Sequence, residues 1–174
     1  MDRQANTSVW IEQVLNRYER PLIRAAFRIT NDVDKARDVV QDTFLKLIKA
    51  DRRKVESHLA AWLFAVTKNR ALDIAKKERR MGQLDNSDTV PDRAAGPQET
   101  MQSNETLRRI LEALDTLSAD HKEAFRLKFQ DQLNYREIGE IMGKSLGTVN
   151  KLITKALSTV QRRLQLAQGE EDVR

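Results

Sequence analysis

Apolar residues recur at steps of three and four along most of the chain, which is the spacing of one buried helical face. The clearest stripe opens at Asn31 or Asp32. Its apolar positions are Val33, Ala36, Val40, Phe44, Leu47 and Ile48. Similar stripes cover residues 8–29, with Pro21 inside, and residues 59–74. The first half of the chain therefore predicts three helices, and Pro21 is expected to kink or split the first.

The second half begins with helical stripes over residues 107–117 and 119–129. A short helix over residues 135–142, a turn over 143–145 and a longer helix over 146–164 follow. Two helices joined by a short turn that contains glycine are typical of a helix-turn-helix, whose second helix enters the major groove of DNA. A plain helical hairpin is the alternative interpretation.

The longer helix has one packing side and one side that can recognise a ligand. We expect the packing side to carry Val149, Leu152 or Ile153, and Ala156. The other side carries, early in the helix, Thr148, Asn150, Lys151, Thr154 and Lys155. Their polar groups can hydrogen-bond to base edges or phosphates, whereas Arg136 and Thr148 are better placed for backbone contacts.

A stretch of different composition separates these halves. Residues 81–104 contain two of the three prolines, two of the six glycines and almost no large apolar residue. Such a segment buries too little surface to offset its ordering entropy. We therefore predict an all-α protein with two small helical domains, residues 1–80 and 105–174, joined by a flexible linker over residues 81–104.

Positive charge is concentrated in the first 80 residues, which hold 18 Lys and Arg against 11 Asp and Glu. A basic loop is expected over residues 51–57, with Arg52, Arg53 and Lys54. The third helix adds Arg70, Lys76, Lys77, Arg79 and Arg80. These cations predict a phosphate-binding surface, and an ordinary solvated face is the alternative.

The composition argues against several kinds of chemistry. With no cysteine and two isolated histidines, the chain has no thiolate metal site or cysteine nucleophile and little basis for zinc or histidine catalysis. We therefore expect no cofactor, no metal and no catalytic residue. Asp38 and Asp42 lie one helical turn apart, and a hydrolase that uses them as acid and base is a remote alternative. No apolar run or signal peptide predicts membrane insertion, so a cytoplasmic location is expected.

Three motifs resemble the small sigma-70 factors of the extracytoplasmic-function (ECF) subgroup, the promoter-recognition subunits of bacterial RNA polymerase. The motifs also follow one another in the order that this family has. Residues 32–49, DVDKARDVVQDTFLKLIK, are similar to the core-polymerase-binding helix of the family. Residues 58–80, HLAAWLFAVTKNRALDIAKKERR, are similar to its downstream-promoter helix. LDTLSADHKEAFRLKF and LNYREIGEIMGKSLGTVNKLITKAL resemble its C-terminal domain, which reads the upstream promoter element.

The resemblance implies partners and roles for particular residues. Core RNA polymerase would be bound through its clamp helices by Asp38, Gln41, Asp42 and Phe44. The opened non-template strand of promoter DNA would be engaged by Trp62, Asn69, Arg70 and Asp73, with help from residues 52–57. Duplex DNA of the upstream element would be met by Arg136, Thr148, Asn150, Lys151, Thr154 and Lys155.

The recognition helix departs from the family pattern, because Gly147-Thr148-Val149 is followed by Asn150-Lys151-Leu152 where members often have K-S-R. The resemblance therefore implies the fold and the role but no promoter sequence. From the chain length we expect no fused C-terminal regulatory domain of the kind that some relatives carry, and we therefore expect control by an external anti-sigma partner. Two alternatives stay open: a helix-turn-helix regulator that does not dock on polymerase, and a helical interaction protein.

Overall fold

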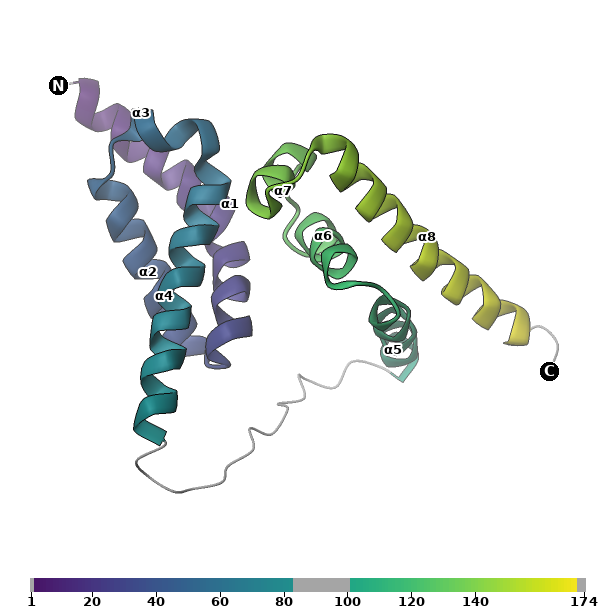
Figure 1. Cartoon of the computed structure of the whole chain (residues 1–174). Helices are drawn as coiled ribbons and strands as arrows, with labels where there is room; N and C mark the ends of the chain where they lie inside the picture. The colour runs from purple at the N-terminus through teal and green to yellow at the C-terminus, as the bar shows by residue number, and fades with distance from the viewer. Residues whose placement is uncertain (1, 83–100, 172–174) are drawn as a thin grey trace. The chain divides into compact units, whose positions relative to one another are not determined.

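Figure 1 shows a computed structural model of the chain, which describes residues 2–82 and 101–171. The chain divides into two compact units, Met1–Asp88 and Thr89–Arg174, called here the N-terminal and the C-terminal unit. Within the described residues the regular structure is helical, with no strand. Residues 83–100 of the expected linker lie outside them, while residues 81–82 end one helix and 101–104 begin the next.

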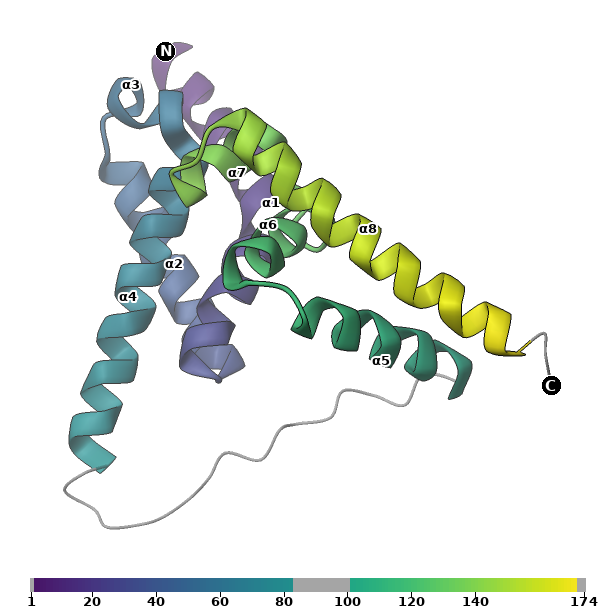
Figure 2. The same ribbon diagram turned by 45° about the vertical axis from the view of Figure 1, so that its right-hand side comes forward.

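The N-terminal unit is built on three long helices. These are α1 (Asp2–Thr30), α2 (Val33–Lys49) and α4 (Leu59–Gly82), and α1 packs against both α2 and α4 (Figures 1 and 2). The core that joins them includes Leu22, Ala26, Ala36, Val39, Leu47, Leu63 and Ala71, none of which is more than 1% exposed. One predicted stripe of each helix thus meets the other two, as expected of amphipathic helices.

Of the two effects predicted for Pro21, a kink or a split, the split does not occur, because α1 continues through Pro21 to Thr30. Proline has no backbone N–H, so the helix lacks one hydrogen bond at Pro21. Leu22, directly after Pro21, and Ala26, one turn beyond Leu22, are fully buried. Burial of this last part of α1 against α2 and α4 favours one continuous helix over a break.

Helix α2 begins where the sequence predicted. Asp32 is its N-cap, and the carboxylate accepts hydrogen bonds from the backbone N–H groups of Asp34 (2.9 Å) and Lys35 (3.1 Å). The two ends of the apolar stripe, Val33 and Ile48, are exposed by 48% and 58%. The stripe is therefore buried only in its middle, where α1 and α4 cover it.

The basic segment 51–57 is mostly helical and not the loop that was predicted. Residues 52–55 form the short helix α3 (Arg52–Val55), which leads through a 3-10 turn, Glu56–His58, into α4. Asp51 caps α3 by accepting a hydrogen bond from the N–H of Arg53 at 3.1 Å. Val55 is 5% exposed and anchors the segment to the core. Four residues are too few for a periodicity to be visible in the sequence.

The described part of the C-terminal unit, residues 101–171, has four helices: α5 (Met101–Asp115), α6 (Ala119–Phe129), α7 (Tyr135–Met142) and α8 (Leu146–Glu171). Helix α8 packs against the other three. Their shared core includes Leu127, Leu133, Ile138, Val149, Ile153 and Ala156, each at most 2% exposed. None of the helices in the described ranges is long and apolar enough to cross a membrane.

Candidate docking and nucleic-acid interfaces

The polar face of α2 carries three of the four residues expected to dock on polymerase. Asp38 and Gln41 are exposed, and Asp42 is half-buried at the edge facing α4. Phe44 is only 7% exposed and belongs to the core between the helices. Phe44 thus lies beneath the polar face of α2 and has almost no exposed surface with which to touch a partner.

Asp42 forms an ion pair with Arg70 of α4. The guanidinium Nε of Arg70 donates a hydrogen bond to Oδ2 of Asp42 at 2.8 Å, and both side chains are more than 40% exposed. Next to this pair in the sequence, the buried hydroxyls of Thr43 on α2 and Thr67 on α4 lie 3.1 Å apart and fix the two helices against each other. The structure therefore joins one residue of the expected polymerase-binding set to one of the expected DNA-binding set.

Helix α4 presents an exposed polar face made largely of the predicted DNA-binding residues. Asn69, Asp73, Lys76 and Arg80 follow at steps of four, three and four, so they lie along one side of the helix, and all are exposed. Trp62 lies on the same side, half-buried. The remaining cations Lys77 and Arg79 are exposed as well. This surface can contact phosphates along much of the helix.

A second set of ion pairs connects α4 to α2. Lys35 pairs with Glu78 and with the cap residue Asp32, whose carboxylate lies 3.3 Å from the Lys35 ammonium. The hydrogen bond to Glu78 raises the pKa of Lys35. The backbone N–H of Lys35 lowers the pKa of Asp32. Glu78 is the one acidic residue in the basic run 76–80, and this pair draws its carboxylate toward α2.

Arg52 is held by the N-terminal unit itself. Its guanidinium lies 4.8 Å from the centre of the Trp10 ring on α1 and pairs with Glu56 at 2.7 Å. The Arg52 hydrogen bond lowers the pKa of Glu56. Arg53 and Lys54 are exposed. Within the expected set, Arg52 thus has a structural role in joining α3 to α1, and Arg53 and Lys54 are the cations that face solvent.

The predicted helix-turn-helix is present as α7, a short turn and α8. Asn134 caps α7 in a capping box with Glu137, and Gly143 ends it at φ +64°, a left-handed conformation that favours glycine. A Cβ added to Gly139 would come within 2.8 Å of the carbonyl oxygen of Lys144. The turn therefore approaches α7 closely at Gly139.

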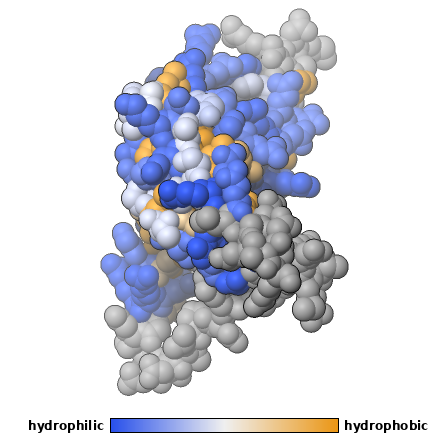
Figure 3. Space-filling view, turned by 90° about the vertical axis from the view of Figure 1, so that its right-hand side faces the viewer, coloured by the Kyte–Doolittle hydropathy of each residue, from blue (hydrophilic) through white to orange (hydrophobic). Residues whose placement is uncertain are grey.

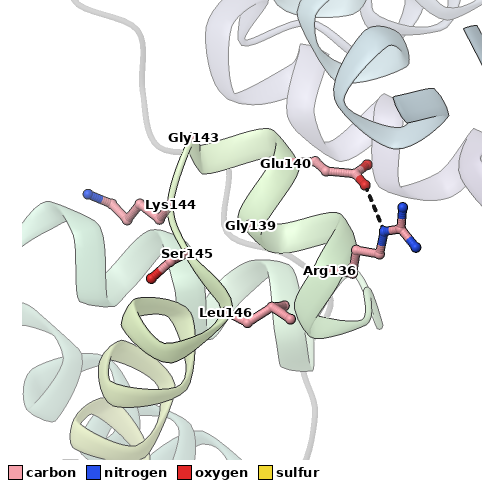
Figure 4. A pocket seen from close by; sticks show the side chains of 7 residues that line it. All are labelled: Arg136, Gly139, Glu140, Gly143, Lys144, Ser145 and Leu146. Carbon is pink, nitrogen blue, oxygen red and sulfur yellow. Dashed lines mark hydrogen bonds and ion pairs between the residues drawn. The ribbon is translucent and has the colours of Figure 1, made fainter. Parts of the chain in front are cut away.

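A pocket lies beside this turn and is lined by Arg136, Gly139, Glu140, Gly143, Lys144, Ser145 and Leu146 (Figure 4). Arg136 pairs with Glu140 at 3.2 Å, and its side chain is 78% exposed. Lys144 points away from that pair in Figure 4, and its ammonium lies 2.8 Å from the carboxylate of Asp120 on α6. Arg136 is thus accessible to solvent, as the predicted backbone contact requires.

The recognition helix α8 has the two sides that the sequence predicted. Thr148, Asn150, Lys151, Thr154 and Lys155 are all exposed. Val149 and Ala156 are buried on the opposite side. The sequence left either Leu152 or Ile153 for the packing side, and the structure selects Ile153, which is buried in the core, whereas Leu152 is half-buried. In the face shown in Figure 3, hydrophilic residues predominate and hydrophobic ones form scattered spots.

Some residues that shape these surfaces were not found from the sequence. Ser145 accepts a hydrogen bond from the N–H of Thr148 at 3.3 Å and so caps the recognition helix. A serine before the first helical residue is a recognisable capping signal. The Thr43 and Thr67 pair and the Trp10 contact had no such signal, because they depend on packing between distant segments. In the part of the chain that the structure describes, no cluster of His, Cys, Asp and Glu could hold a metal ion.

Comparison with known proteins identifies the two units. Residues 14–81 match Sigma-70 region 2, and residues 107–160 match Sigma-70 region 4. The chain is 28% identical over 153 residues to the ECF RNA polymerase sigma factor SigE of Mycolicibacterium smegmatis, covering 86% of this chain and 59% of that protein. It is 29% identical to the ECF RNA polymerase sigma factor EcfG of Rhodopseudomonas palustris, covering 87% of this chain and 83% of that one.

A solved structure agrees with these relatives. The sigma factor RpoE from Bartonella quintana, crystallised in complex with the anti-sigma factor NepR, is 26% identical with a TM-score of 0.50, and the match covers 88% of this chain and 96% of that one. The match to region 2 falls within the N-terminal unit and the match to region 4 within the C-terminal unit. The chain belongs to the sigma-70 family of bacterial RNA polymerase sigma factors, in its ECF subgroup.

Proposed function

We propose that this sigma factor docks on core RNA polymerase through Asp38, Gln41 and Asp42 of α2. The observation that carries the proposal is the acidic and amide-bearing face of α2, on which Asp38 and Gln41 are exposed and take no part in the core of the N-terminal unit. Exposed carboxylates suit a partner surface that supplies cations. The match to Sigma-70 region 2 spans this helix and makes polymerase the partner.

The two units divide promoter recognition between them in this proposal. The N-terminal domain, residues 1–80, engages the downstream element and the opened non-template strand through the exposed face of α4, with Arg53 and Lys54 binding backbone phosphates. The C-terminal domain, residues 105–174, reads the upstream element as a duplex through α8. Residues 81–104 join them, so binding of one domain raises the local concentration of the other at the promoter.

Core docking can be tested by substitutions on α2. Gln41→Ala and Asp38→Lys should weaken binding to purified core polymerase and leave thermal stability nearly unchanged, because exposed positions contribute little to folding. Asp34→Asn is the control, since Asp34 is exposed on the same helix and pairs with Arg37 at 3.5 Å. Core affinity that is unchanged in both test variants would place the docking face elsewhere.

Run-off transcription tests the function as a whole. Purified core polymerase with this chain and genomic fragments should give discrete promoter-dependent transcripts that core polymerase alone does not give. The helix-turn-helix regulator without polymerase docking is not favoured, because the chain matches Sigma-70 region 2 as well as region 4. Sigma factors are initiation factors and not enzymes, so the hydrolase alternative for Asp38 and Asp42 is not favoured either.

Regulation by an anti-sigma factor in the cytoplasm completes the proposal. Its support is the similarity to the Bartonella sigma factor, which was crystallised with an anti-sigma factor. Co-purification of this chain with the products of neighbouring genes, followed by transcription with and without the captured protein, tests it. A captured protein that leaves run-off transcription unchanged would not be the regulator.

A further inference from the structure

Asp42 and Arg70 are each assigned above to a different partner, yet in the free chain they bind each other. The Arg70 guanidinium and the Asp42 carboxylate lie 2.8 Å apart across the interface of α2 and α4. Each side chain is a little over 40% exposed, so polymerase can reach the carboxylate and DNA can reach the guanidinium. Neither partner can take its group fully while the pair is intact.

We infer that this ion pair couples polymerase docking to engagement of the DNA strand. In the free sigma factor, Asp42 keeps Arg70 from phosphates. When the cations of polymerase take over Asp42, Arg70 is released at the surface where the opened strand arrives. This inference rests on the proposed function, in which α2 binds polymerase and α4 binds DNA.

The contacts around the Asp42 and Arg70 pair indicate that release of Arg70 changes only the partners of these two side chains. The buried hydroxyls of Thr43 and Thr67, 3.1 Å apart, adjoin the pair and are both fully buried. Thr43 also donates a hydrogen bond to the carbonyl of Val39 at 2.9 Å. These contacts fix α2 against α4 beneath the pair. The helices therefore need not move when the two charged groups exchange partners.

The size of the coupling follows from the exposure of the pair. An ion pair at the protein surface changes an equilibrium by a factor of about 1.4 to 5, and the factor shrinks with added salt. Pairing with Asp42 in the free chain therefore lowers the affinity of Arg70 for DNA phosphates by the same factor. Because coupling between two binding events is reciprocal, Arg70 should weaken polymerase docking on Asp42 by an equal factor.

The first arm of the test uses the free chain and a fluorescein-labelled oligothymidine at low salt, measured by fluorescence anisotropy. Asp42→Asn should tighten binding by about two- to fivefold. Asp34→Asn removes the same charge from α2 and should have a clearly smaller effect. In an Arg70→Ala background the gain from Asp42→Asn should disappear. A gain equal to that of Asp34→Asn, or one that persists without Arg70, overturns the inference.

The second arm measures binding to core polymerase without DNA. Arg70→Ala should tighten core binding by about two- to fivefold, because Asp42 is then no longer held. Lys68→Ala removes an exposed cation of the same helix and should change core affinity little. Weaker or unchanged core binding by Arg70→Ala overturns the coupling. If the unaltered protein gave no run-off transcripts with core polymerase, the proposed function itself would be wrong. Failure of the coupling and failure of the proposed function are therefore distinguishable.

Discussion

The two units hold their binding side chains in different ways. In the N-terminal unit, charged residues pair across helices: Asp42 and Arg70, which belong to the proposed interfaces, pair with each other, and Lys35 pairs with Glu78 beside them. In the C-terminal unit, the polar side of α8 is exposed, and Lys151 and Lys155 make no ion pair with any residue the structure describes. The first surface is thus built into the packing of the helices, whereas the second lies on one side of a single helix.

This difference suits the two ligands. A major-groove reader must offer its side chains to base edges that are already fixed in a duplex, so an exposed helix face suffices. The N-terminal unit meets two partners on adjoining helices, and its charges interact before either partner arrives. Substitutions of the paired residues Asp42 and Arg70 should therefore affect the contact between α2 and α4 as well as binding, whereas those on α8 should affect binding alone.

The largest expected effect is at Phe44, beneath the docking face. Phe44→Ala should destabilise the N-terminal unit by about 3–5 kcal/mol, the usual cost of truncating a buried aromatic residue. Leu45→Ala is the matched control, because Leu45 is the next residue and is 54% exposed. Hydrogen exchange in α2 and α4 measures both. Normal protection in Phe44→Ala with lost core binding would show that Phe44 contacts polymerase directly.

The next effect concerns the turn that positions the recognition helix. Gly139→Ala should destabilise the C-terminal unit by about 1–3 kcal/mol, because the added methyl group meets the Lys144 carbonyl and must displace the turn. Gly147→Ala is the control, since a Cβ there meets nothing within 4 Å. Hydrogen exchange in α7 and α8 gives the comparison. Equal protection in the two variants would mean that the turn can shift freely.

The recognition side of α8 should respond in binding and not in stability. Asn150→Ala should cost about 1–3 kcal/mol at one promoter position and relax the base preference there. Lys155→Ala should weaken all sequences alike and lower the salt slope by about one unit. Transcription from promoter variants and its salt dependence measure both, with exposed Arg162, two turns further along α8, as the control for Lys155. Sequence-independent losses from both substitutions would show that Asn150 does not read a base.

The smallest effect is a pH dependence at the Arg52 and Glu56 pair. Arg52 lowers the pKa of Glu56 from its usual 4.5, so the charged carboxylate is favoured in the folded state. Its contribution to stability is present above that usual value and is lost as pH falls through the lowered folded pKa. The difference in thermal midpoint between the unaltered protein and Glu56→Gln should therefore shrink in acid. A difference that is independent of pH would contradict this pairing in solution.

Much of the architecture could be predicted from the sequence, because the spacing of apolar and polar residues along a helix shows which side of it is buried. The stripe of α2, its Asp32 cap, and the turn at Gly143 depend on residues within a few positions of one another. The same holds for the exposed side of α8, where five residues were predicted outward and all five are exposed. Their assignment to bases, phosphates or polymerase stays a prediction.

Tertiary structure decided what lies between helices. Helical spacing leaves Leu152 and Ile153 almost equally suited to face inward, and only packing against the rest of the unit selects Ile153. The continuity of α1 through Pro21 likewise depends on how much surface α2 and α4 bury behind it. The pairing of Asp42 with Arg70 joins residues 28 positions apart, and its distance is set by the packing of α2 on α4. Sequence spacing fixes the side of a helix on which a residue lies, whereas packing fixes which distant residue it meets.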